Sequence, residues 1–129
     1  MIEFINSPEA QAFGLPFSQA VRVGDVLYLS GCLGNIPGKM ELVKGGIEAE
    51  TRQTMRNIEA VLKANGLGFG DVFKCTVMLA DMADWPAFNE VYRGYFKQHF
   101  PARMAFAASA LALGARVEVQ CNAFVGANR

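Results

Sequence analysis

The chain contains few of the residues from which most metal and redox sites are built. Among its 129 residues there are one histidine, His99, and three cysteines, Cys32, Cys75 and Cys121, without CxxC spacing. A single histidine excludes a metal site with two histidine ligands from one chain. An odd number of cysteines without a secretory leader favours reduced thiols and a cytoplasmic protein.

Long apolar runs and clusters of like charge are also missing. The apolar N-terminal segment, residues 1–6, is too short for a membrane span and lacks the basic residues of a signal peptide. Twelve Lys and Arg residues balance twelve Asp and Glu residues, and no segment collects charge of one sign. Because nucleic acids are bound through clustered basic residues, we do not expect this chain to bind nucleic acid.

Apolar residues, in contrast, are abundant, at 52% of the chain. The length predicts a single domain over residues 1–129. A domain of this size buries only about two-thirds of its extended-chain surface. We therefore expect some apolar side chains to contact another subunit; an apolar ligand pocket is the alternative interpretation.

Hydrophobic periodicity predicts two helices. Over residues 47–65, apolar side chains recur at three- and four-residue spacing, and Gly66 is typical of a residue that ends a helix. A second helix begins at Asp84 as its cap and extends to near His99. At the C-terminal end of a helix, the cationic form of the histidine would interact favourably with the helix dipole. We favour this role over that of a general base.

The remaining segments predict strands and a fold class. Residues 11–16 are expected to form a loop, and the glycines at 66, 68 and 70 a turn, because they follow a helix and precede a strand. Strands are predicted over 1–6, 18–23, 26–30, 72–80, 103–109 and 115–125. The order β-β-β-α-β-α-β-β is typical of an α+β fold with a mixed β-sheet, two helices packed on one face and the other face bare.

The last predicted strand alternates between two kinds of side chain. Val117, Val119, Cys121 and Ala123 alternate with Arg116, Glu118, Gln120 and Asn122. The apolar set is expected to lie in the core. The polar set forms either a solvated surface or a wet interface between subunits.

Two residues are candidates for chemistry on their own. Arg103 opens an otherwise apolar strand; it is either a surface residue at the strand end or a clamp that binds a carboxylate through its two-pronged guanidinium. Cys32 lies in a glycine-rich loop, where a reactive thiol is conceivable. A lone cysteine without a histidine partner is more often inert, and we favour that interpretation.

Short motifs occur in a fixed order and spacing over nearly the whole chain: residues 17–21 (FSQAV), 29–31 (LSG), 45–47 (GGI) with Thr51 and Gln53, 71–77 (DVFKCTV), Asp81, Asp84, 88–92 (FNEVY), 95–96 (YF) and 101–103 (PAR). None of these motifs is specific by itself, but their combination is. Together they resemble the RidA/YjgF/YER057c/UK114 family of enamine and imine deaminases.

The resemblance implies an assembly and a reaction. The assembly is a homotrimer of chorismate-mutase-like subunits, with helices outside and three clefts between subunits. The reaction is the hydrolysis of reactive enamine or imine acids, such as 2-aminoacrylate, to 2-keto acids and ammonia. Members of the family need no metal and no organic cofactor.

The resemblance also implies site residues. Arg103 would bind the substrate carboxylate, assisted by the backbone N–H of Ala105, with Ser30 and Gly31 in the facing loop. Phe17 would line the cleft where the family usually has tyrosine, and Ala105 stands in place of the usual cysteine. Gln120 would stand where the family usually has a glutamate on the last strand that positions the attacking water. A glutamine can bind this water but cannot accept its proton.

These departures leave alternatives to deamination. The first is a family member that binds small carboxylates without deaminase activity, since the binding residues are retained and the water-activating ones are changed. The second and weaker one is an endoribonuclease or translation inhibitor, an activity attributed to some relatives. The neutral charge and the single histidine argue against it.

Overall fold

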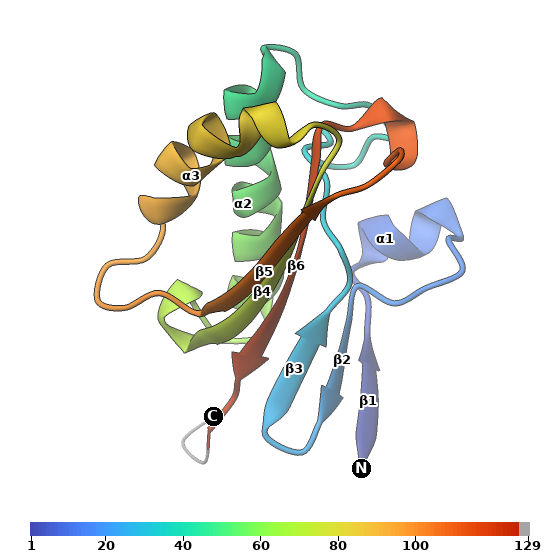
Figure 1. Cartoon of the computed structure of the whole chain (residues 1–129). Coiled ribbons are helices and arrows are strands. Elements are labelled where there is room, and N and C mark those ends of the chain that lie inside the picture. Colours follow the sequence, from blue (N-terminus) through green and yellow to red (C-terminus); the bar gives the residue numbers. More distant parts are fainter. Residues whose placement is uncertain (127–129) are drawn as a thin grey trace.

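The computed structural model describes residues 1–126 and contains a six-stranded mixed sheet in the order β1-β2-β3-β6-β4-β5 (Figure 1). The strands are β1 (Ile2–Ile5), β2 (Ala20–Val23), β3 (Val26–Leu29), β4 (Val72–Leu79), β5 (Ala102–Ala107) and β6 (Val117–Phe124). All neighbouring strands are antiparallel except β4 and β5. This parallel pair needs a crossover, and α3 (Trp85–Arg93) lies within it.

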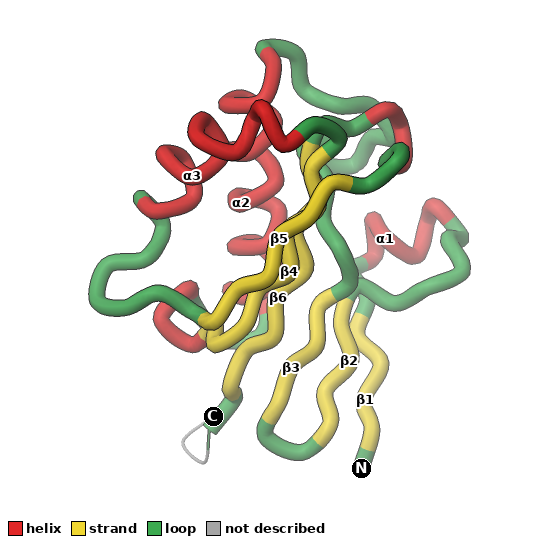
Figure 2. Tube along the Cα trace, viewed as in Figure 1, coloured by secondary structure: helices red, strands yellow, loops and turns green. Residues whose placement is uncertain are grey.

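The two longer helices, α2 (Gly46–Ala64) and α3, cover one face of the sheet (Figure 2). The predicted arrangement of a mixed sheet with both helices on one face is thereby confirmed. Helix α2 buries the predicted stripe at Thr51, Met55, Ile58 and Leu62. The threonine hydroxyl donates to the carbonyl of Ile47 at 2.7 Å, so a polar residue is accommodated on the buried face.

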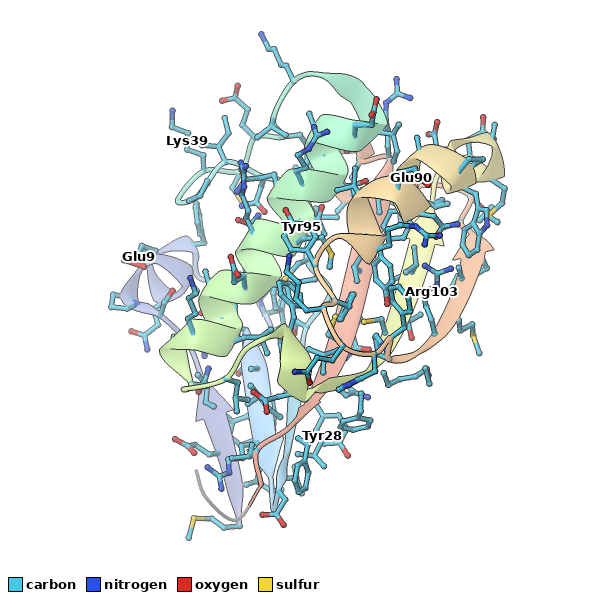
Figure 3. All side chains as sticks on the ribbon, turned by 90° about the vertical axis from the view of Figure 1, so that its left-hand side faces the viewer. Glu9, Tyr28, Lys39, Glu90, Tyr95 and Arg103 are labelled. Carbon is cyan, nitrogen blue, oxygen red and sulfur yellow. The ribbon has the colours of Figure 1, made fainter. Side chains whose placement is uncertain are left out.

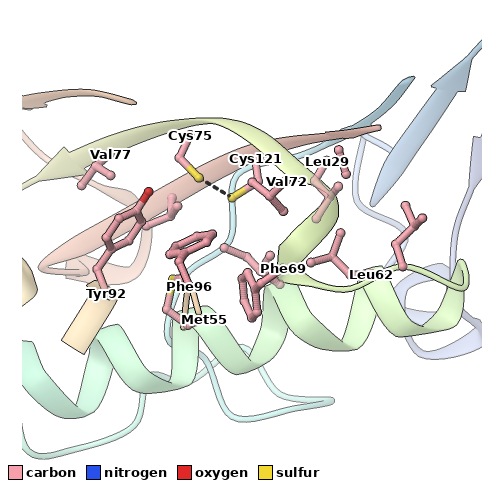
Figure 4. Packing of buried hydrophobic residues seen from close by; sticks show 14 of the residues in the cluster. Leu29, Met55, Leu62, Phe69, Val72, Cys75, Val77, Tyr92, Phe96 and Cys121 are labelled. Carbon is pink, nitrogen blue, oxygen red and sulfur yellow. Dashed lines mark hydrogen bonds between the residues drawn. The ribbon is translucent and has the colours of Figure 1, made fainter. Parts of the chain in front are cut away.

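Between the helices and the sheet lies one continuous core (Figure 4). Strand β6 contributes Val117, Val119, Cys121 and Ala123, each completely buried, as expected from the alternation in this strand. Helix α3 contributes Phe88 and Tyr92, whose stacked rings have centroids 5.4 Å apart. Glu50 is a buried acid at the edge of this core; its carboxylate accepts a hydrogen bond from the Arg116 backbone N–H at 2.9 Å.

Two predicted elements differ from the structure. Residues 11–13, expected to be loop, belong to the short helix α1 (Pro8–Phe13), because the Ser7 side chain caps this helix and left-handed Gly14 ends it. Helix α3 ends at Arg93 rather than near His99, since the following N–H groups form tighter turns, such as that from Tyr95 to the carbonyl of Tyr92. His99 is exposed in the loop beyond, so its predicted place at a helix end is wrong.

The sheet face away from α2 and α3, called the open face below, carries seven of the exposed large apolar residues. Because paired residues of neighbouring strands point to the same face, the register assigns these side chains to it: Ile2, Phe4, Val23, Tyr28, Met104, Phe106 and Phe124, between 42% and 69% exposed. A polar stripe of Thr76, Glu118, Gln120 and Asn122 crosses its centre. Helices α2 and α3 do not cover this face.

Candidate functional site

Arg103 is held against helix α3 on the helix-covered side of the sheet (Figure 3). Its Nη1 donates to Asn89 Oδ1 at 2.8 Å. Its Cζ lies 4.6 Å from the ring centroid of Trp85 and 4.8 Å from that of Tyr92. We call these four residues the Arg103 cluster. An arginine stacked on two rings is positioned rather than solvated, and its remaining N–H donors can bind a carboxylate.

Ala105 brings a backbone donor to the same edge of the sheet. Strand β5 is the edge strand next to β4 within residues 1–126. The N–H of Ala108 donates to the carbonyl of Leu79 at 2.8 Å. Since successive residues of a strand direct their N–H groups to opposite sides, the N–H of Ala105 points away from β4, towards the free edge. Arg103 and Ala105 thus present a guanidinium and an N–H along one strand.

A second cluster is formed by Gly31 and Glu118 on the open face, with Cys32 beside them packed towards the core. The Glu118 carboxylate lies directly over Gly31, so that a Cβ at this glycine would collide with Oε2. A two-way backbone bridge between Cys32 and Val119, with N···O distances of 2.8 and 3.1 Å, fixes the loop beside β6. We call this group the Gly31–Glu118 cluster. Burial raises the pKa of the Glu118 carboxyl above its ordinary value.

The surroundings of Cys32 disfavour its thiolate form. Burial, together with the nearby charge of Glu118, raises its pKa to about 12. A thiol becomes a nucleophile only as the thiolate. The interpretation of Cys32 as an inert thiol is therefore supported.

Helix α2 anchors the loop that carries Gly31. The side-chain amide of Asn57 donates to the carbonyls of Leu33 and Asn35 at 2.9 and 3.0 Å, while its own oxygen accepts from Gln53 at 2.9 Å. Gly34 packs against the helix so closely that an added Cβ would lie 2.6 Å from the carbonyl oxygen of Glu50. Loop 31–35 is thus part of the rigid frame.

The other predicted residues have varied surroundings. Ser30 donates its hydroxyl to the carbonyl of Ser18 at 2.6 Å and so ties the loop to the segment that follows Phe17. The ring of Phe17 is 56% exposed. The amide nitrogen of Gln120 donates to the carbonyl of Leu29 at 2.8 Å and to Asn122 Oδ1 at 2.7 Å. Both hydrogens of this amide are therefore engaged within the sheet.

The predicted site residues do not converge within one chain. Arg103 is in register with Cys75, and Cys75 with Cys121, on the helix-covered face. Gln120 is in register with Thr76, on the open face, and Glu118 lies two residues before it on the same side. Ser30, Gly31 and Gln120 thus gather near Glu118, while Arg103 and Ala105 lie on the other side of the sheet.

Sequence reasoning missed the residues that hold Arg103, and it did not single out Glu118. Asn89 and Tyr92 lie in the motif at 88–92, but nothing in the motif assigns them to Arg103. Glu118 was visible in the alternation of the last strand. What distinguishes Glu118 is its contact with Gly31, and only the tertiary structure shows this contact. Within residues 1–126 no group of three or more His, Cys, Asp or Glu side chains could hold a metal ion.

Comparison with known proteins identifies the family of this fold and site. The family model described as Endoribonuclease L-PSP matches residues 5–125. The chain therefore belongs to this family, which is the RidA/YjgF/UK114 family of the resemblance noted in the sequence. No helix within residues 1–126 is long and apolar enough to cross a membrane.

Individual relatives carry names that refer to imine chemistry or to the family. A goat protein named 2-iminobutanoate/2-iminopropanoate deaminase is 45% identical over 95% of this chain and 89% of its own length. A Drosophila RutC family protein, UK114, is 43% identical over 96% of the chain and 90% of its own length. The crystal structure of a Yersinia pestis member of the Rid family superposes with a TM-score of 0.90, at 35% identity, over 97% of this chain and all of that one.

Proposed function

We propose that the protein hydrolyses small enamine or imine acids to 2-keto acids and ammonia, at clefts between the subunits of a homotrimer and without a cofactor. The observation that carries this proposal is the Arg103 cluster, in which a stacked guanidinium lies beside the free N–H of Ala105. Both groups are suited to a carboxylate. The named imine deaminases among the relatives supply the reaction class.

The reaction needs little beyond orientation and proton transfer. Arg103 and Ala105 would hold the carboxylate, which places the neighbouring C=N carbon near the sheet edge. Water adds to this carbon, the nitrogen takes up a proton, and the C–N bond breaks to release ammonia and the keto acid. A base that orients the water and accepts its proton contributes about 10²–10⁴-fold.

We assign that proton transfer to Glu118 rather than to Gln120. The pKa of Glu118 is raised by burial, which brings it closer to neutral pH and makes it a better proton acceptor. Gln120 cannot accept a proton, and its amide hydrogens are already engaged with Leu29 and Asn122. Its role would be to hold the end of β3, and with it Ser30 and Gly31, in place.

The two clusters can form one site only if two chains contribute. Arg103 and Glu118 lie on opposite faces of the same sheet, so the Glu118 of one chain would meet the Arg103 of a neighbour. The exposed apolar residues of the open face provide the surface for such an assembly. A homotrimer in which the open faces point inwards would bury them and create three equivalent sites.

The decisive experiment measures keto-acid release from freshly generated 2-aminoacrylate. The wild-type protein should accelerate release, and Arg103→Ala should return the rate to background. Arg93→Ala is the matched control, because Arg93 is an exposed arginine of α3 whose only ion pair within residues 1–126 is with Glu90 across one turn. A background rate with the wild-type protein, together with Arg103-dependent binding of a 2-keto acid, would replace deamination by carboxylate binding alone.

A further inference from the structure

A pair of cysteines lies in the core next to Arg103, on the same face of the sheet. The proposed reaction does not use this pair. Cys75 on β4 and Cys121 on β6 are register partners, and both are completely buried (Figure 4). Their sulfur atoms are 3.1 Å apart and share a hydrogen bond. Residues directly opposite in antiparallel strands have Cα atoms about 4.5–5.5 Å apart, which falls in the range that a disulfide spans.

The surroundings distinguish this pair from the third cysteine. The hydrogen bond with Cys121 lowers the pKa of the Cys75 thiol; burial opposes this, and Tyr92 and the charges of Arg103 and Lys74 lower it further. For Cys32, burial and Glu118 act in the opposite direction. Thiolate character controls reactivity towards oxidants. The chemistry therefore favours the buried pair, although Cys32 is the more accessible residue.

We propose that Cys75 and Cys121 are a modification site, a dithiol that a small hydroperoxide oxidises to a disulfide linking β4 to β6. The Cys75 sulfur attacks the peroxide, whose O–O bond breaks to give a sulfenic acid at Cys75 and an alcohol, or water from hydrogen peroxide. The Cys121 sulfur then attacks the sulfenic sulfur, the S–S bond forms, and a water molecule leaves. The two sulfurs lose two electrons in total, and the peroxide gains them.

Access to this site is from the sheet edge. Cys75 is in register with Arg103 on β5, the edge strand, and the buried Tyr92 hydroxyl lies beside the Cys75 thiol. Tyr92 belongs to α3, a helix of nine residues. Local opening of β5 and α3 would expose the pair to a small oxidant, whereas a bulky oxidant would remain excluded.

Peptide mapping of the full-length protein tests the proposal. Trypsin places Cys32, Cys75 and Cys121 in separate peptides, residues 23–39, 75–93 and 117–129. After treatment with hydrogen peroxide, only one of the three thiols should be titratable, and a dithiol reductant should restore all three. When the remaining free thiol is blocked before digestion, we expect peptides 75–93 and 117–129 to be linked by a disulfide and peptide 23–39 to carry the blocking group.

Two variants separate the outcomes. Cys32→Ser should form the same linked peptide, and Cys75→Ser should not form it. The disulfide should also raise the urea midpoint of Cys32→Ser reversibly, because it closes a long loop in the unfolded chain. Recovery of Cys75 and Cys121 as blocked thiols, under conditions where Cys32 of the wild type is oxidised or forms dimers, would overturn the proposal. This mapping needs no substrate, so its result is independent of the proposed deaminase activity.

Discussion

The Arg103 cluster and the Gly31–Glu118 cluster are held in place by different forces. Arg103 is positioned by side chains of one short helix, through two aromatic rings and one amide. The Gly31–Glu118 cluster is positioned by backbone hydrogen bonds and by a contact that leaves no room for a methyl group. Changes at the first should therefore alter affinity, and changes at the second should alter catalysis, if both serve the same reaction.

The largest effect is expected when the two clusters are prevented from meeting. Phe106→Asp places a charge on the apolar open face, and burying an unpaired charge there would prevent assembly. Sedimentation should show the loss of the trimer, and the deaminase rate should fall to background. Met40→Asp is the control, since Met40 is 53% exposed in a turn away from the sheet. Full activity of monomeric Phe106→Asp would show that one chain contains the whole site.

Glu118→Gln should remove the proposed base while preserving the shape of the side chain. We expect kcat to fall by about 10²–10⁴-fold, with little change in the dissociation constant of a 2-keto acid. In the wild type the rate should rise with pH through the raised Glu118 pKa, because the ionised form is the base, and the variant should lack this limb. A variant that retains the wild-type rate and pH profile would exclude Glu118 as the base.

The same substitution has a consequence for stability. A carboxyl group with a raised pKa binds its proton more tightly in the folded state, so its contribution favours folding at low pH and is lost as the pH rises through the folded pKa. Glu118→Gln should remove this loss. Urea unfolding at several pH values should therefore show a smaller decline in stability towards neutral pH in the variant than in the wild type.

A smaller effect is expected from crowding the same carboxylate. In Gly31→Ala the new Cβ would displace Glu118, and we expect kcat to fall by about 10²-fold with ligand affinity retained. Gly70→Ala is a matched control, because Gly70 has no atom within 4 Å of an added Cβ and no left-handed backbone. If Gly31→Ala weakened keto-acid binding and spared kcat, the division of labour between the clusters would be reversed.

The smallest effect should come from Asn89→Ala. This change removes the hydrogen bond that orients Arg103 but leaves the stacking on Trp85 and Tyr92. We expect keto-acid affinity to weaken about tenfold, which is about 1.4 kcal/mol, while kcat changes little. Asn65→Ala provides the comparison, since Asn65 makes a similar bond to the carbonyl of Val61 at the far end of α2. Calorimetric titration measures the keto-acid affinity of both variants. Equal affinities would show that Asn89 does not contribute to the site.

Where the sequence prediction succeeded, the signal was local. Helix α2 was predicted to within a residue at each end, because its periodicity and the left-handed Gly66 are properties of the segment itself. The alternation of β6 identified its buried side chains for the same reason. Helix α1 was missed because its six residues carry no buried stripe, so its cap at Ser7 and its end at Gly14 are the only signals.

The candidate site was predicted only in part. The motif at 101–103 points to Arg103, and the structure places this residue against side chains of α3, while its role as a carboxylate clamp stays a prediction. The prediction of Gln120 as the water-positioning residue rests on one polar position of a strand in which Glu118 and Gln120 both alternate with apolar neighbours. A strand with a period of two offers both positions equally, and sequence spacing does not distinguish them.

The sequence by itself determined the order of the six strands and the two longer helices, the placement of those helices on one face, the core residues of β6 and the family. These follow from composition, from periods of 2 and 3.6 residues, and from motifs within short segments. The tertiary structure alone decided that Arg103 and Glu118 lie on opposite faces, that Glu118 covers Gly31, and that Cys75 meets Cys121. Each of these depends on strand register and on contacts between residues far apart in the chain, which no local pattern encodes.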